Sequence, residues 1–141
     1  MSNQQEIFNT VARHLLTQMK RSLHGQGKCA YRGDDGLKCA AGCLIPDAKY
    51  DVAFEGKSAF SSTLAKTWKE LGYSCIDVDL ITDLQRLHDW KEPDEWKNQL
   101  QMEAIRYDLK FNLHEILQGP INENTNNNST IVGIGKNFSD L

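Results

Sequence analysis

Three of the four cysteines in this chain lie within one short stretch, KCAYRGDDGLKCAAGC, at residues 28–43. The fourth cysteine is Cys75. Thiolates bind zinc and act as nucleophiles, two thiols can form a disulfide, and a free thiol can also pack as a small apolar group. The stretch therefore presents four alternatives, and the residue spacing is the first evidence for choosing among them.

A zinc site is the first alternative, in a small zinc-stabilised protein with Cys29, Cys39 and Cys43 as ligands. Cys39 and Cys43 are four residues apart, so on a helical turn both sulfurs share one face, and Cys29 could approach across a hairpin. Structural zinc sites, however, normally use two closely spaced pairs, and here the gaps are nine, three and thirty-one residues. The spacing therefore favours no metal and no cofactor.

A disulfide between Cys29 and Cys39 is the second alternative, and the expected compartment argues against it. The N-terminus lacks the basic start and apolar stretch of a secretory signal, which predicts a cytoplasmic protein with reduced cysteines. The third alternative is packing, because the alanines and glycine between Cys39 and Cys43 fit a close approach to a neighbouring helix.

Catalysis is the fourth alternative, with Cys39 as the nucleophile and His88 as the base of a hydrolase or transferase. Asp89 follows directly, but neighbouring side chains diverge by about 100° on a helix, so we expect an orienting carboxylate from elsewhere. His88 also borders an apolar stripe, as a histidine hydrogen-bonded within the fold often does. The other histidines have no neighbours that favour a catalytic role: His14, His24 and His114.

Binding is the interpretation that the polar residues around the cysteines favour, with a host protein or a small anionic ligand as the partner. Arg32 stands beside a glycine and could present its planar fork to a phosphate or carboxylate. We expect the binding residues to be Arg32, Gly42, Tyr50, His88 and Asp89.

Helices must position most of these residues. Apolar side chains recur every three or four positions in four segments, which predicts helices over residues 3–23, 58–71, 79–90 and 93–117. Turn residues at 33–36 separate the short segments 29–32 and 37–40, which predicts a β-hairpin. We therefore expect a mainly helical α+β fold, with four to five helices around one core and a short β-hairpin.

Length and composition indicate one globular domain. A chain of 141 residues, 40% of them hydrophobic and 25% charged, can bury a single core. Five of the seven residues from 122 to 128 are asparagine. We therefore predict a domain over residues 1–118, followed over residues 119–141 by an asparagine-rich linker and a tail with at most one edge strand.

Charge and hydropathy limit the partners. The net charge is −3, and residues 1–45 carry six Lys and Arg against three Asp and Glu. This basic excess is too small to favour nucleic acid as a partner. No apolar run approaches the roughly 20 residues needed to cross a bilayer, so we expect no membrane partner. A homo-oligomer stays open.

A longer motif in the chain resembles that of a known family. It has the form Cys-x-Tyr-Arg, Gly-x-Lys-Cys-Ala-x-Gly-x-Leu-Ile and Leu-Gln-x-x-His-Asp, and it begins here at Cys29, Gly36 and Leu84. The pattern is similar to that of small uncharacterised proteins of tailed phages, prophages and bacteria, from the first helix to about Leu109. Further matching positions are Pro46, Asp47, Tyr50, Glu55, Gly56 and Trp96.

The resemblance implies a setting and no specific chemistry. Small phage accessory proteins commonly bind and inhibit a host factor, including a defence factor, or sequester a nucleotide-like signal. We therefore expect an accessory binding protein that acts in the cytoplasm of the host. The cysteine-dependent enzyme and the zinc-stabilised protein are kept as the alternatives.

Overall fold

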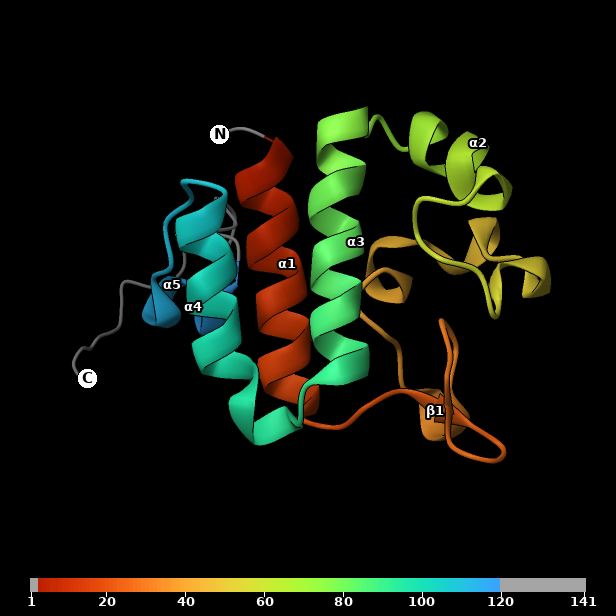
Figure 1. Ribbon diagram of the computed structural model, residues 1–141, viewed down its shortest axis with the longest axis horizontal. Coiled ribbons are helices and arrows are strands. Elements are labelled where there is room, and N and C mark those ends of the chain that lie inside the picture. Colours follow the sequence, from red (N-terminus) through yellow and green to blue (C-terminus); the bar gives the residue numbers. More distant parts are fainter. Residues whose placement is uncertain (1–2, 120–141) are drawn as a thin grey trace, which may run out of the picture.

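Three helices that pack against one another form the body of the protein in the computed structural model, which describes residues 3–119 (Figure 1). These are α1 (Asn3–Gln18), α3 (Cys75–Trp90) and α4 (Trp96–Arg106), and each contacts the other two. The shorter α5 (Leu113–Gln118) packs against α1. The largest fully buried apolar side chains in the core are Phe8, Leu15, Ile45, Leu64, Trp68, Leu80, Ile81, Leu84, Trp96, Leu100 and Ile116.

A less regular half of the protein lies on the other side of α3 (Figure 1). It holds a two-stranded antiparallel sheet, β1 (Leu23–His24) and β2 (Lys28–Cys29), and the helix α2 (Ser62–Glu70). Short 3₁₀ turns connect these elements: η1 (Asp34–Gly36), η2 (Gly42–Leu44), η3 (Asp47–Lys49) and η4 (Val52–Phe54). The second of them packs on α1.

The expected fold class is confirmed. Among residues 3–119, five α-helices surround one cluster of buried side chains, and a short two-stranded sheet accompanies them. No helix in this part of the chain is both long and apolar enough to cross a membrane. Apart from Gly119, the predicted linker and tail over residues 119–141 lie outside the described residues.

The hairpin is displaced along the chain from its predicted place. Leu23 pairs with Cys29 and His24 with Lys28. The connecting turn uses two glycines with positive φ, at +59° and +86° for Gly25 and Gly27. The antiparallel pairing extends one residue beyond the strands, because the Ala30 amide donates to the carbonyl of Ser22 at 2.9 Å. Of the predicted pairing between 29–32 and 37–40, a single bridge from Arg32 to Lys38 is present.

Helix ends differ from the predicted ones where capping or backbone conformation decides them. The first helix stops at Gln18, five residues early, because Met19 takes a φ of 51°. The third begins at Cys75 instead of Asp79, because Ser74 and Asp77 form a capping box. The predicted helix over 93–117 is two helices separated at Asp108, whose φ is 55°. The helix predicted over 58–71 corresponds to α2, which is shorter and spans Ser62–Glu70.

Replacing Gly42 with alanine is expected to destabilise the fold by about 1–3 kcal/mol, the usual cost of overpacking a close contact. An added Cβ would lie well within van der Waals distance of the Tyr31 carbonyl oxygen. The contacted atoms are all backbone atoms of Tyr31, so they cannot move away as a flexible side chain could. Chemical denaturation followed by circular dichroism measures the change.

Gly25→Asn is the matched control for this substitution. Gly25 has open space around the position of a Cβ and a φ of +59°, which asparagine tolerates. The control should unfold at the denaturant concentration of the parent protein. Equal stability of Gly42→Ala and the parent would contradict the close approach.

Candidate functional site

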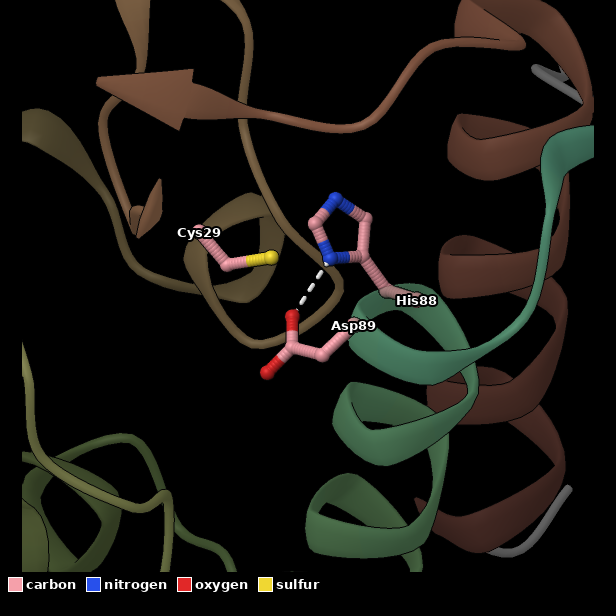
Figure 2. Close-up of side chains that lie close together, drawn as sticks. All are labelled: Cys29, His88 and Asp89. Atoms are coloured by element: carbon pink, nitrogen blue, oxygen red, sulfur yellow. Dashed lines mark hydrogen bonds and ion pairs between the residues drawn. The ribbon is translucent and has the colours of Figure 1, made fainter. Parts of the chain in front are cut away.

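A thiol, an imidazole and a carboxylate meet where β2 faces the end of α3. Figure 2 shows Cys29, His88 and Asp89 pointing toward one another. One ligand atom from each residue lies within 4.8 Å of the other two. The structure thus joins the predicted residues His88 and Asp89, and the thiol beside them belongs to Cys29.

Both ring nitrogens of His88 are occupied by hydrogen bonds within the fold. The backbone N–H of Ser22 donates to Nε2 at 2.9 Å, so this nitrogen carries a lone pair. The proton of the neutral ring is therefore on Nδ1, which donates to Oδ1 of Asp89 at 2.7 Å. The ring is fully buried and stacks on Trp96, with centroids 5.6 Å apart. This geometry leaves His88 no free nitrogen with which to act as a general base.

The carboxylate that orients His88 is its neighbour Asp89, so the expectation that it comes from elsewhere is wrong. Gln85, one helical turn earlier, donates from Nε2 to the same Oδ1 at 2.8 Å and draws the carboxylate toward its own side of α3. The other end of the Gln85 amide accepts from the backbone N–H of Ala41 at 2.8 Å. Gln85, His88 and Asp89 therefore connect α3 to two other segments.

The thiol of Cys29 completes this cluster. Burial, followed by the negative charge of Asp89, raises the pKa of Cys29 to about 11. The thiol is thus protonated at neutral pH. A protonated thiol is a poor nucleophile.

The protonation of His88 does not suit a metal ion in this cluster. Metal-binding histidines normally donate the proton of their second nitrogen to an acceptor. Here the group facing Nε2 is the donor N–H of Ser22, so a metal on Nδ1 would leave two N–H groups pointing at each other. A metal on Nε2 would displace Ser22 and point away from Asp89, which faces Nδ1 (Figure 2).

The other two thiols of the zinc and nucleophile hypotheses lie at η2, Cys39 before it and Cys43 within it. Cys39 is fully buried, and its sulfur accepts from the Gly42 amide at 3.2 Å. Burial raises the pKa of Cys39 strongly, and that of Cys43 to about 12. Cys43 donates to the Ala40 carbonyl at 3.1 Å. Cys39 lacks the partly exposed, electropositive surroundings of a reactive cysteine. Cys43 is half-buried, and the cations of Lys38, Arg13 and Arg32 lower its pKa less than burial raises it.

The three predicted zinc ligands are not assembled. Among residues 3–119, the group of three or more potential ligands that lies close enough for one metal is that of Cys29, His88 and Asp89. All four cysteines are free thiols. The zinc-stabilised protein built on Cys29, Cys39 and Cys43 therefore has no geometric basis here.

Arg32 binds the fold itself rather than presenting its fork to solvent. Nη1 donates to the Gly42 carbonyl at 2.9 Å, and Nη2 donates to the Ile45 carbonyl at 2.6 Å and to Asp47 at 3.1 Å. The guanidinium also lies 4.7 Å from the ring centre of Tyr50. Its side chain is 18% exposed. The predicted ligand residues Arg32 and Gly42 therefore hold each other.

Tyr50 is the remaining predicted ligand residue, and its hydroxyl is also committed within the fold. It donates to Glu55, whose carboxylate accepts from the backbone amides of Tyr31 and Arg32 at 2.8 and 3.1 Å. Burial, followed by the hydrogen bond to Glu55, raises the pKa of Tyr50 to about 12. The hydroxyl is therefore a proton donor to Glu55, whose carboxylate ties the end of η4 to the segment after β2.

A groove of about 430 Å³ opens beside α1, and its lining includes none of Cys29, His88 and Asp89. Its walls are the outer side of α1 and the segment that runs from Lys38 into η2. The lining residues are Thr10, Arg13, His14, Thr17 and Gln18 from α1, and Lys38 and Cys43 from the facing segment. None of these side chains is a carboxylate, and two are permanent cations at neutral pH.

The backbone of Lys38 is bound tightly to α1. Gln18 accepts from the Lys38 amide at 3.1 Å and donates to its carbonyl at 3.0 Å. The same carbonyl accepts from Nε2 of His14 at 2.7 Å. These bonds hold the Lys38 backbone against α1, and Lys38 and Arg13 both line the groove.

The charges of the groove are incompletely neutralised. Arg13 makes no hydrogen bond or ion pair with any residue between 3 and 119. Lys38 lies 3.7 Å from Asp47, whose side chain is 83% exposed and already pairs with Arg32. A guanidinium without a counter-charge among residues 3–119 and a half-paired ammonium line the same groove, which makes it attractive to a small anion.

Sequence reasoning missed this groove, although α1 carries a recognisable signal. Thr10, Arg13, His14 and Thr17 recur at spacings of three and four on the side opposite the apolar stripe. Such a stripe usually indicates a solvated face. Only the return of the chain at Lys38 turns that face into the wall of a groove.

No family model, curated protein or solved structure matches this chain. The resemblance to small phage and bacterial proteins stays a prediction.

The tautomer of His88 is expected to be the one protonated at Nδ1, because Ser22 donates to Nε2. Long-range ¹H–¹⁵N NMR spectra of the ring distinguish the two nitrogens. Addition of one equivalent of zinc should leave the His88 signals unchanged. A zinc-dependent loss of these signals that Cys29→Ser abolishes would show that the cluster binds metal.

The thiols are expected to react with Ellman's reagent in a fixed order. Cys75 is exposed and should react first, and Cys75→Ser should remove the fast phase. Cys39 should react only on unfolding, because burial raises its pKa and closes access to the sulfur. A fast phase at neutral pH that Cys39→Ser removes would restore the nucleophile hypothesis.

Proposed function

We propose that this protein is a binding module that holds a small phosphate-bearing or carboxylate-bearing anion in the groove between α1 and Lys38. The observation that carries the proposal is that Arg13 and Lys38 line one groove whose lining holds no carboxylate. Arginine binds oxyanions through two parallel hydrogen bonds, and lysine adds a mobile point charge.

The size and the polar walls of the groove fit a ligand of this kind. Its volume of about 430 Å³ falls within the range of about 300–1,000 Å³ usual for small-molecule sites. The hydroxyls of Thr10 and Thr17 lie one helical turn on either side of Arg13 and His14, where they can donate to further oxygens of a ligand. The same lining offers no large apolar surface for a protein partner.

Binding is favoured over catalysis by the state of the expected catalytic groups. Cys39 is buried and protonated, and both nitrogens of His88 are engaged. A nucleophile must reach its base and its substrate, and neither residue is free to do so. The hydrolase hypothesis thus gains no support from the geometry.

The proposal agrees with one half of what the family resemblance implies. A phage accessory protein that sequesters a nucleotide-like signal needs a small-anion site of this type. The expected residues of the site change, however, because Arg32, Gly42, Tyr50, His88 and Asp89 hold the fold together. The proposed ligand residues are Arg13 and Lys38, with His14 between them.

Substituting Arg13 with glutamine is expected to weaken anion binding about tenfold to a hundredfold, the usual contribution of hydrogen bonds to a charged group. The probe is inorganic pyrophosphate at low ionic strength, where surface charges are least screened. Binding is followed through the backbone amide signals of residues 10–18 and 38–43 in ¹H–¹⁵N NMR spectra.

Lys97→Gln is the matched control, since it removes the same charge from the exposed face of α4. The control should bind pyrophosphate as the parent protein does. Equal weakening by both substitutions would mean that net charge alone attracts the anion. Amide shifts that are absent from the groove segments of the parent protein would rule out the proposed site.

A further inference from the structure

His14 is the one titratable group of the groove that can change its charge near neutral pH. It lies on α1 beside Arg13 and faces the Lys38 segment. Nε2 donates to the Lys38 carbonyl at 2.7 Å, so the proton of the neutral ring is on Nε2. Nδ1 therefore carries a lone pair, and it has no hydrogen-bond partner among residues 3–119.

The surroundings of His14 oppose its protonation in the absence of a ligand. Burial lowers the pKa of His14 below its ordinary value, and the positive charge of Lys38 and the imidazole of His88 lower it further, against the raising effect of the Lys38 carbonyl. Arg13 lines the same groove from the same helix. Among residues 3–119, no carboxylate acts on the ring to compensate for a second proton.

An anion in the groove would supply the compensation that the protein lacks. Its oxygen could accept from a protonated Nδ1, and its charge would offset the cations of Arg13 and Lys38. The Nε2 bond to the Lys38 carbonyl survives, because a protonated ring donates from both nitrogens. The ring therefore needs no rearrangement to bind the ligand.

We propose that anion binding in this groove is coupled to the uptake of one proton from solvent by Nδ1 of His14, and that the preferred ligand is a doubly charged oxyanion such as a phosphate monoester. The inference rests on the function proposed above. Three cations, Arg13, Lys38 and protonated His14, face the groove against the single half-shared carboxylate of Asp47. The remaining charge matches a dianion.

The direction of the pH dependence follows from linkage. The anion stabilises the protonated ring, so the bound state titrates at a higher pH than the free state. Affinity is then weakest above the pKa of the bound state, rises as the pH falls, and levels off below the pKa of the free state. One unit of difference between the two pKa values corresponds to a tenfold change in affinity.

Sulfate is the decisive probe, because it stays doubly charged throughout the relevant pH range while phosphate takes up a proton itself. Its affinity is measured by NMR titration at about pH 6 and pH 8 and constant ionic strength. We expect binding on the order of tenfold tighter at the lower pH. The ring signals of His14 should show that its pKa rises when sulfate is bound. Methyl sulfate, a single charge of similar shape, should bind more weakly.

His14→Gln separates protonation from structure. The amide nitrogen of glutamine can keep the hydrogen bond to the Lys38 carbonyl, but the side chain cannot take up a proton. The variant should still bind sulfate, with the weaker affinity that the parent shows at about pH 8, and its affinity should no longer change between the two pH values. His24→Gln removes an exposed histidine outside the groove and should keep the pH dependence of the parent.

The outcomes distinguish this inference from the proposed function. Sulfate that binds the parent with one affinity at both pH values, or a pH dependence that His14→Gln retains, would overturn the coupling and leave the anion site standing. Equal affinity for sulfate and methyl sulfate would overturn the preference for a dianion. If neither sulfate nor pyrophosphate perturbs the groove at either pH, the anion site fails and the coupling fails with it.

Discussion

The carboxylate of Asp89 is the constraint on which the arrangement of the irregular half depends. It accepts hydrogen bonds from Gln85 and His88 at the end of α3, and the thiol of Cys29 lies within 4.8 Å of it. Both donors relay the connection, because His88 accepts from the Ser22 amide and Gln85 accepts from the Ala41 amide. One charged group thereby fixes the hairpin and the turn into η2 against a single helix. The Asp89 side chain is 29% exposed, and its two donors compensate for the hydration that it loses.

This role explains why residues of catalytic type appear without catalytic geometry. A histidine between an amide donor and a carboxylate is locked in one tautomer, and a thiol beside the same negative charge stays protonated. Arg32 also bonds within the fold, because its guanidinium donates to the backbone carbonyls of Gly42 and Ile45. The motif that joins these residues is thus accounted for by the cohesion of the fold. Function is better sought where polar groups have no partner in the part of the chain that the structure describes, and Arg13 in the groove is such a group.

The groove is a consequence of the same packing. The Asp89 network holds the chain near Ala41, and the amide of Gln18 binds the backbone of Lys38 just before it. Between these two attachments the chain must run close along α1. The cationic side chains of Arg13 and Lys38 then line the same groove, and the ring of His14 is bonded to the Lys38 carbonyl. Electrostatic preorganisation of this kind costs little further ordering when a ligand binds.

The sequence by itself determined the helices, since an apolar stripe of period 3.6 records the core that each helix must cover. It also indicated that His88 and Asp89 belong together, but it did not indicate their roles. A side chain's chemistry limits which partners it can bond, and the fold determines which of them it meets. Helix ends at Met19 and Asp108 escaped the pattern because local backbone conformation decides them. The groove could not be predicted, because residues 13 and 38 become neighbours only through tertiary packing. The proposed binding site therefore depends on long-range contacts, which only the tertiary structure reveals.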